Sequence, residues 1–177
     1  PFGLLSIGGP LLDEGHEVKL LDAERHHLKA DEIAAQVSSY RPDIVMTGHS
    51  GSTPAHPAAM VALEAARRAC PDALTVYGGV YPTYHARDIL TRHAYVDLIV
   101  RGEGESVILD LVRAVENGKP LNGVNGITFR QGEGDIRENA PASTISDLNL
   151  WRVGWELIED WDLYLCFGLG RAAIVQF

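Results

Sequence analysis

Basic residues are scarce in this sequence. Its 177 residues include 15 Lys and Arg against 24 Asp and Glu, which gives a formal net charge of −9. A nucleic-acid-binding surface needs clustered Lys and Arg to neutralise phosphates, and no such cluster occurs. The charge balance therefore argues against nucleic acid and favours small molecules or proteins as partners.

Cysteines and long apolar runs are also scarce. Cys70 and Cys166 lie far apart in the sequence and lack the spacing of metal ligands. We therefore expect no disulfide framework, and we expect the protein to lie in a reducing cytoplasm. No apolar run approaches the roughly 18–20 residues of a transmembrane helix, and the first residues lack the basic-then-apolar order of a signal peptide. Because the first residue is Pro1 and the last residues resemble an unfinished strand, we expect a piece of a longer protein.

Helical and strand-like segments alternate along the first two thirds of the chain. Helices are expected at 2–14, 30–40, 55–69, 84–93 and 105–118, and strands at 16–23, 42–48, 73–78 and 96–100. Short apolar strands separated by helices favour parallel pairing with right-handed crossovers. The expected fold class is α/β, a flavodoxin-like three-layer sandwich with a parallel sheet.

The pattern begins with a helix instead of a strand. In the flavodoxin-like order 2-1-3-4-5, the first strand lies between the second and the third. We therefore expect this chain to lack a central strand, which leaves two strand edges unpaired in the interior. Such a chain should be unstable by itself.

The composition changes after Gly118. Two strand-like runs flank residues 131–134 and predict a hairpin, which a Pro/Ser/Thr-containing linker follows. A short acidic segment then carries three tryptophans, Trp151, Trp155 and Trp161. The expected organisation is a domain over 1–118, then a hairpin and linker over 119–177.

Three strand ends carry the candidate binding chemistry. They are the hydroxyl-rich "TGHSGST" (47–53), the pair Gly78-Gly79 and the turn "RGEGE" (101–105). Each alone is typical of an ordinary turn or helix cap. Since parallel strands end at one edge of a sheet, the three together favour a nucleotide-like or planar ligand.

Other common sites are absent. No G-x-G-x-x-G or G-x-x-x-x-G-K-[ST] follows a strand, which argues against a Rossmann dinucleotide site or a P-loop. No catalytic constellation is visible among the scattered histidines. His49, at a strand end, is the histidine with the best position for a cofactor contact.

The segments "GHSGST", "GGVYPT" and "VRGEGE" resemble the cobalamin-binding domain of cobalamin-dependent radical S-adenosylmethionine enzymes. The resemblance covers roughly 1–118 and implies that the cofactor's nucleotide tail passes close to Gly78 and Gly79. It implies cofactor-binding roles for Thr47, Gly48, His49, Ser50, Ser52, Gly78, Gly79, Val80, Tyr81, Thr83, Arg101, Gly102 and Glu103. The D-x-H-x-x-G motif that supplies a cobalt ligand in many cobalamin domains is not present, so a protein ligand to cobalt is undecided.

Residues 155–177 resemble the stretch that leads into the barrel of the anaerobic magnesium-protoporphyrin IX monomethyl ester oxidative cyclases, which form the fifth ring of bacteriochlorophyll. This resemblance implies a porphyrin substrate, a [4Fe–4S] cluster and S-adenosylmethionine in the full-length parent. The family's C-x-x-x-C-x-x-C motif does not occur in the chain. Catalysis by this chain alone is therefore not expected.

Three alternatives remain open at this point. A cobalamin-dependent radical methyltransferase has the same architecture. A receiver-like or cobalamin-sensing domain would bind without catalysis, although receivers need carboxylates at a strand end and residues 46–53 contain none. A flavodoxin-like electron carrier fits the fold but needs a phosphate loop, and no convincing one is visible.

Overall fold

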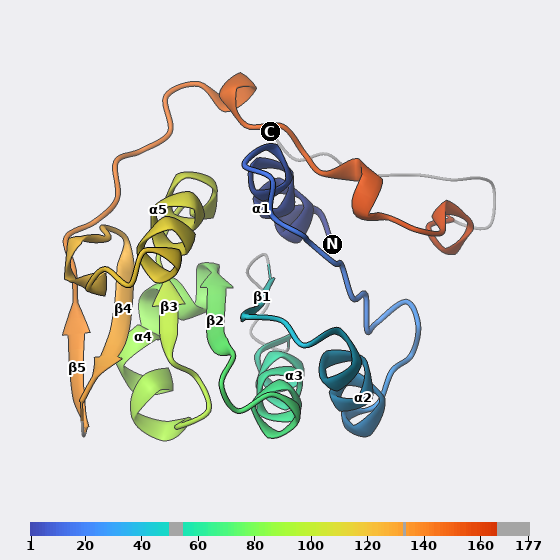
Figure 1. Cartoon of the computed structure of the whole chain (residues 1–177), viewed down its shortest axis with the longest axis horizontal. Helices are drawn as coiled ribbons and strands as arrows, with labels where there is room; N and C mark the ends of the chain where they lie inside the picture. The colour runs from blue at the N-terminus through green and yellow to red at the C-terminus, as the bar shows by residue number, and fades with distance from the viewer. Residues whose placement is uncertain (50–54, 133, 166–177) are drawn as a thin grey trace.

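A five-stranded sheet forms the middle layer of the molecule (Figure 1). The computed structural model describes residues 1–49, 55–132 and 134–165. Strand order in the sheet is β1-β2-β3-β4-β5, with the first three strands parallel and the last two antiparallel. The strands are β1 (Ile44–His49), β2 (Leu74–Gly79), β3 (Leu98–Val100), β4 (Ile127–Gln131) and β5 (Asp135–Glu138).

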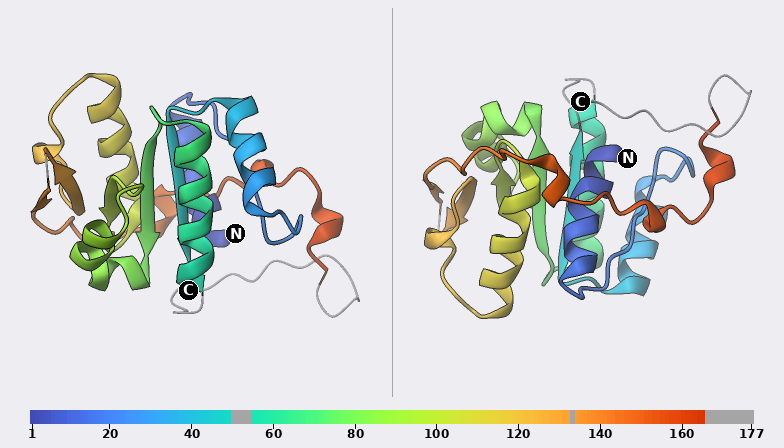
Figure 2. Two further views of the ribbon diagram at one scale, coloured as in Figure 1. Left: turned by 90° about the horizontal axis from the view of Figure 1, so that it is seen from below. Right: turned by 90° about the horizontal axis from the view of Figure 1, so that it is seen from above.

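Helices cover both faces of this sheet, as Figures 1 and 2 show. They are α1 (Phe2–Asp13), α2 (Ala30–Tyr40), α3 (Ala55–Ala69), α4 (Val80–Arg92) and α5 (Gly104–Glu116). The side chains of α1 and α5 pack with Val76 and Leu98 on one face. Those of α3 and α4 pack with Tyr77 and Ile99 on the other face, and α2 packs on α3. The predicted three-layer α/β sandwich is confirmed.

Four single-turn 3-10 helices complete the described part of the chain. They are η1 (Leu121–Gly123), η2 (Leu148–Leu150), η3 (Trp155–Leu157) and η4 (Trp161–Leu163). Among the described residues, no helix is both long enough and apolar enough to cross a membrane.

The predicted strand at 16–23 is wrong, because residues 16–22 form no strand and join no ladder. The alternation of Val18, Leu20 and their polar neighbours favours a half-buried extended segment, but a strand also needs a hydrogen-bonded neighbour. In the described structure β1 pairs with β2 alone and is an edge strand. Residues 16–22 therefore have the pattern of a strand without a partner.

A large cavity separates residues 16–25 from β1. Its volume is about 1120 Å³, and side chains of α1, α2 and α3 close it together with Ile44–Gly48 of β1. Apolar side chains such as Leu4, Val18 and Val45 line it. The cavity therefore has apolar walls on the helices that flank it and lies along the open edge of the sheet.

The hairpin after Gly118 belongs to the main sheet. The two strands flank 132–134 as predicted, and β4 pairs antiparallel with β3, with Leu98 opposite Phe129. The Arg130 Nη2 atom donates to the Leu90 carbonyl at 2.5 Å and so fastens the hairpin to α4. The hairpin therefore extends the sheet that carries the candidate site.

Helix α4 begins earlier than predicted, at Val80 instead of residue 84. Gly79 is its N-cap, with φ 114° and ψ −175°, a backbone conformation that is essentially restricted to glycine. Pro82 is tolerated in the first turn, where its missing N–H would have no helical partner. The helix therefore starts directly at the candidate site.

Gly8 and Gly9 of α1 lie where the C-terminal segment crosses this helix. Residues 152–157 run across this helix, and the Gly154 N–H donates to the Leu5 carbonyl at 2.9 Å (Figure 2). A Cβ atom on Gly9 would lie 2.1 Å from the Arg152 carbonyl oxygen, and one on Gly8 would lie 2.4 Å from the Leu157 side chain. Glycine at these positions lets the C-terminal segment pack directly on the helix backbone.

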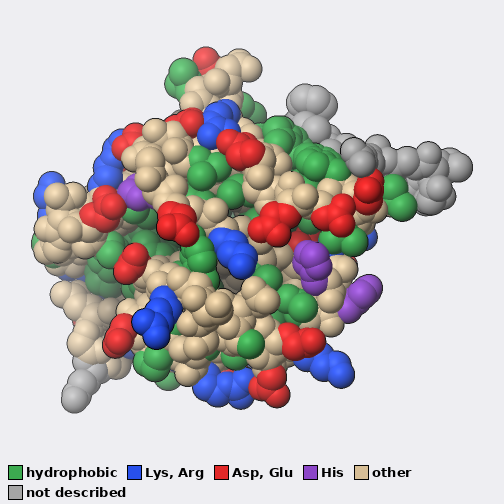
Figure 3. Space-filling view, turned by 45° about the vertical axis from the view of Figure 1, so that its right-hand side comes forward, with side chains coloured by type: hydrophobic (Ala, Val, Ile, Leu, Met, Phe, Trp, Pro, Cys, Tyr) green, Lys and Arg blue, Asp and Glu red, His purple; other side chains and the backbone are tan. Residues whose placement is uncertain are grey.

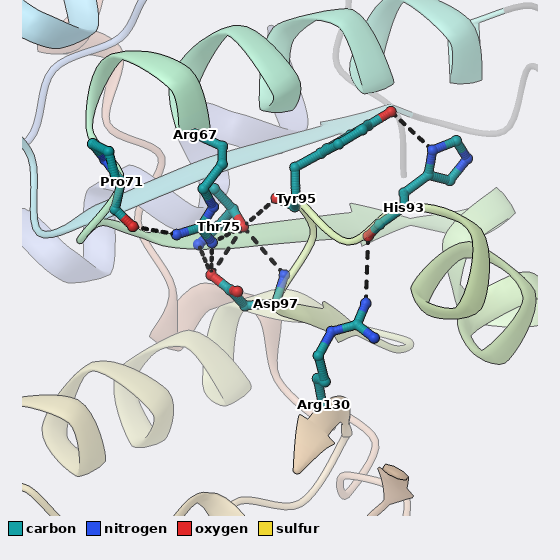
Figure 4. A network of polar contacts seen from close by, with 7 residues as sticks. All are labelled: Arg67, Pro71, Thr75, His93, Tyr95, Asp97 and Arg130. Atoms are coloured by element: carbon teal, nitrogen blue, oxygen red, sulfur yellow. Dashed lines mark hydrogen bonds and ion pairs between the residues drawn. The ribbon is translucent and has the colours of Figure 1, made fainter. Parts of the chain in front are cut away.

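A polar network joins α3, β2 and the residue before β3 at the amino end of the sheet (Figure 4). The carboxylate of Asp97 pairs with Arg67 and accepts from the Thr75 N–H at 2.8 Å and the Thr75 hydroxyl at 3.0 Å. The two charged side chains are 26% and 32% exposed. Loss of the carboxylate removes the acceptor of the Thr75 N–H and the ion pair of Arg67, although Arg67 still donates to the Pro71 carbonyl and the Thr75 hydroxyl to the Tyr95 carbonyl.

We expect Asp97→Ala to lower the free energy of unfolding by about 2 kcal/mol, since a partly buried guanidinium and an amide lose their acceptor. Asp31→Ala is the matched control, because it removes the neighbouring Arg68–Asp31 pair, whose side chains are 62% and 92% exposed. That change should cost less than about 0.5 kcal/mol. Urea unfolding of both variants measures the difference, and equal losses would contradict this account.

Candidate functional site

The three predicted strand ends lie side by side at one edge of the sheet. Gly48 is paired with Gly78, His49 with Gly79, and Gly78 with Val100. Arg101, Gly102 and Glu103 follow directly after β3. The prediction that these turns share one edge is confirmed, since parallel strands bring their carboxyl ends together.

A strip without side chains crosses this edge on the face covered by α1 and α5. Gly48 and Gly78 are paired neighbours, and alternation gives them the same face as Met46 and Val76, which pack against that layer. Gly104 adds a third bare position, where a Cβ atom would lie 3.3 Å from the Ile7 side chain of α1. Backbone is therefore exposed along this strip beneath the helix layer.

Of the paired glycines Gly48 and Gly78, Gly78 is the one that the described structure does not itself require. A Cβ atom there would lie 3.8 Å from its nearest described neighbours, both in Val100, which is ordinary van der Waals contact. In contrast, a Cβ on Gly48 would lie 3.0 Å from the Gly78 carbonyl oxygen. A close approach by a ligand gives Gly78 a reason to lack a side chain.

Gly79 and Gly102 both adopt positive φ, at 114° and 75°. Thr83 of α4 joins them, because its hydroxyl donates to the Gly79 carbonyl at 2.8 Å and accepts from the Gly102 N–H at 3.0 Å. One side chain therefore connects the turn after β2 with the turn after β3.

Val80 and Tyr81 point in different directions. Val80 is 54% exposed. The Tyr81 ring packs on the α3 and α4 side of the sheet, with ring centroids 4.6 Å from His56 and 4.3 Å from His85. Burial raises the pKa of the neighbouring Tyr77, whose hydroxyl lies 3.3 Å from the His56 Nδ1 atom. The Tyr77 hydroxyl therefore stays neutral in this aromatic cluster, across the sheet from the glycine strip.

Arg101 and Glu103 make contacts within the protein. Arg101 pairs with Glu138 at 3.1 Å and donates to the Asn139 carbonyl at 2.5 Å. The Glu103 carboxylate accepts from the Ile145 N–H at 2.7 Å. Both side chains hold the hairpin and linker against the turn after β3, and their predicted contact with a cofactor stays a prediction.

Thr47 is half-buried and lines the large cavity together with Gly48, Ile7 and Gly8. His49 is described here by its backbone pairing alone. Ser50 and Ser52 lie outside the described residues. The described part of this strand end, Thr47 and Gly48, lies at the same edge of the sheet as Gly78.

The described surface has neither a continuous basic patch on the face shown in Figure 3 nor a cluster of metal ligands among the described residues. In Figure 3, acidic and basic side chains are interspersed on the visible face, with no continuous basic patch. Within the described ranges, no group of three or more His, Cys, Asp and Glu side chains is arranged to hold a metal ion. The described strip at the ends of β1 and β2 consists of backbone and glycine, with the Thr47 and Thr83 hydroxyls nearby.

Sequence reasoning missed two features of this site. A threonine in the first turn of a helix, such as Thr83, is expected to donate to the carbonyl four residues earlier. Its second partner, the Gly102 N–H, depends on tertiary structure and could not be predicted. The approach of Ile7 to Gly104 also depends on how α1 packs on α5. The motif "RGEGE" signals a special turn there without showing what lies against it.

The comparisons with known proteins agree with this arrangement. Residues 1–112 match the family model of the B12 binding domain. The anaerobic magnesium-protoporphyrin IX monomethyl ester cyclase of Synechocystis is 50% identical over 177 residues, which is 100% of this chain and 35% of the relative. The cyclase of Rubrivivax gelatinosus is 34% identical over 179 residues, 99% of this chain and 31% of the relative.

A solved structure shares the fold. The radical S-adenosylmethionine methyltransferase TsrM from Kitasatospora setae, with cobalamin and a [4Fe–4S] cluster bound, matches with a TM-score of 0.68 and 21% identity. The match covers 86% of this chain and 28% of that one. The chain spans about a third of the length of the curated cyclases that it matches. Because the family model covers most of the sheet and its flanking helices, the chain belongs to the B12-binding domain family.

Proposed function

We propose that the chain is the cobalamin-binding module of an anaerobic magnesium-protoporphyrin IX monomethyl ester oxidative cyclase. The main observation in support of the cofactor site is the space beside Gly78. The described protein would accommodate a Cβ atom there, yet the residue is glycine. Identity of 50% along the whole chain favours the cyclase over the methyltransferase alternative.

The residues at this edge fit a cofactor with a long polar tail. The paired glycines Gly48 and Gly78 admit it close to the backbone, and Thr47 carries a hydroxyl at the same end of β1, on the opposite face of the sheet. We assign contacts with the same tail to Ser50, Ser52, Gly79 and Gly102. When bound, cobalamin supplies transfer chemistry at its cobalt, while the protein orients it and excludes side reactions.

The remaining parts of the reaction belong to the full-length parent. The chain carries no C-x-x-x-C-x-x-C motif, so a [4Fe–4S] cluster, S-adenosylmethionine and the porphyrin would be held by other parts of that protein. We also propose the cytoplasm as its location, which suits a cluster that must stay reduced. Residues 1–118 would form the binding domain, the hairpin within 119–177 extends its sheet, and the rest of 119–177 would connect it to the catalytic barrel.

Protein mixed with hydroxocobalamin and then desalted is expected to retain corrin absorbance, with one equivalent bound per chain. Parallel samples with flavin mononucleotide and with heat-denatured chain are the controls. Flavin retention would favour the electron carrier, and loss of corrin from the folded protein would contradict the proposal. In the full-length parent, a cyclised pigment from the porphyrin ester supports the cyclase, whereas a product heavier by one methylene supports the methyltransferase.

A further inference from the structure

The hydroxyl of Thr83 links two backbone turns that the proposed cofactor site depends on. One turn follows β2 at Gly79, and the other follows β3 at Gly102. The hydroxyl lies between them, 2.8 Å from the Gly79 carbonyl oxygen and 3.0 Å from the Gly102 nitrogen. The Thr83 hydroxyl therefore contacts the end of β2 through Gly79 and the turn after β3 through Gly102.

Both turns consist of backbone that is intrinsically adaptable. Gly79 at φ 114° and Gly102 at φ 75° adopt conformations in which other residues are strained. Glycine also loses more conformational freedom than other residues when it is ordered. A fixed spacing between the two turns therefore needs an additional restraint, and the Thr83 hydroxyl is placed to supply it.

The hydrogen-bonding capacity of this hydroxyl is largely used within the protein. Its one proton goes to the Gly79 carbonyl, and one of its two lone pairs accepts from Gly102. Thr83 is therefore better suited to hold the site's shape than to bind the cofactor directly.

We propose that Thr83 is a positioning residue, which sets the spacing of the Gly79 and Gly102 backbones and thereby pre-organises the cobalamin site. This inference rests on the proposed function for the identity of the ligand. Its physical basis is that a restraint present before binding reduces the ordering that binding must otherwise impose. The hydroxyl acts through the two glycines and needs no contact with the cofactor.

Thr91 provides a matched control on the same helix. Its hydroxyl donates to the Arg87 carbonyl at 2.7 Å, the same bond to the residue four positions earlier that Thr83 makes to Gly79. That described bond stays within α4 and does not reach another strand end. Thr91→Val therefore removes the helix bond alone, whereas Thr83→Val removes both the helix bond and the link between turns.

The test is a hydroxocobalamin titration of the full-length parent protein and of three variants. Thr83→Val should bind about tenfold more weakly, the effect expected when a site loses one or two hydrogen bonds of ordinary strength. Thr83→Ser keeps the hydroxyl and should restore affinity to within about twofold. Thr91→Val should match the unchanged protein.

Amide hydrogen exchange in the cofactor-free protein separates positioning from a general loss of stability. The Gly102 N–H should be protected in the unchanged protein and in Thr83→Ser, and should exchange faster in Thr83→Val with β2 amides unaffected. Equal affinity of Thr83→Val and the unchanged protein, or equal weakness of the Ser and Val variants, overturns the proposal. An unprotected Gly102 amide in the unchanged protein overturns it even if the Val variant does not fold. Failure of the unchanged protein to bind cobalamin would instead contradict the proposed function.

Discussion

In the proposed full-length parent, extending the chain by the residues that would precede Pro1 is expected to raise its free energy of unfolding by about 5 kcal/mol or more, which is comparable to the whole stability of a small domain. We propose that these residues form a parallel β-strand in the cavity between β1 and residues 16–22. The added strand would pair with both, which gives the order 2-1-3-4-5 of a flavodoxin-like sheet. The open edge of β1 and the unpaired segment at 16–22 would then both gain partners.

The shape and lining of the cavity support a strand as its occupant. Its volume of about 1120 Å³ is beyond the usual range of small-molecule pockets, about 300–1,000 Å³. It runs beside β1 from Ile44 to Gly48, and side chains of α1 such as Leu4 and Leu11 cover it. Pro1 lines the same space, so a segment joined to it would enter the cavity directly. A strand there, followed by α1 and then 16–22, makes the usual right-handed crossover.

Urea unfolding of the extended chain against residues 1–177 measures this effect. A control extension of the same length, made of Gly and Ser, can pair with β1 but cannot fill the apolar cavity, so its gain should be much smaller. Hydrogen exchange provides the structural readout, since amides in 16–22 should become protected in the extended chain. Equal unfolding midpoints for the natural and Gly/Ser extensions would contradict a strand in this cavity.

Local patterns predicted most of the helices. The helices at 30–40 and 55–69 have the predicted bounds, because an amphipathic period and its end signals are contained in the segment itself. The strands at 42–48 and 73–78 were predicted in the same way, to within two residues. Residues 16–23 were assigned wrongly because strand formation depends on a neighbour, and no local pattern shows whether that neighbour is present.

The candidate site was predictable as far as topology determines it. Parallel strands place Gly48 and Gly78 at one edge whatever the side chains are. The start of α4 at Val80 was missed because it depends on the unusual backbone of Gly79, and glycine alone does not show which conformation it adopts. The role of Gly8 and Gly9 was missed for a similar reason, since the segment that crosses them lies more than 140 residues later in the chain.

Gly78→Ala is expected to weaken cobalamin binding by about 5- to 150-fold, the range that corresponds to the 1–3 kcal/mol typical of overpacking by a small group. The physical reason is that the added methyl group would occupy space next to the backbone that the cofactor's tail approaches. The protein itself should tolerate the change, since the new Cβ would lie 3.8 Å from Val100. Hydroxocobalamin titration measures the affinity, and urea unfolding of the cofactor-free protein should show a change below about 0.5 kcal/mol.

Gly79→Ala is the contrasting variant one residue later. At φ 114° and ψ −175° an alanine is strained, so this change should lower the stability of the cofactor-free protein by about 1–3 kcal/mol. The pair therefore separates two reasons for adjacent glycines: room for a ligand at 78 and backbone conformation at 79. If Gly78→Ala destabilises the cofactor-free protein as much as Gly79→Ala does, or binds cobalamin with unchanged affinity, the tail does not pass over Gly78.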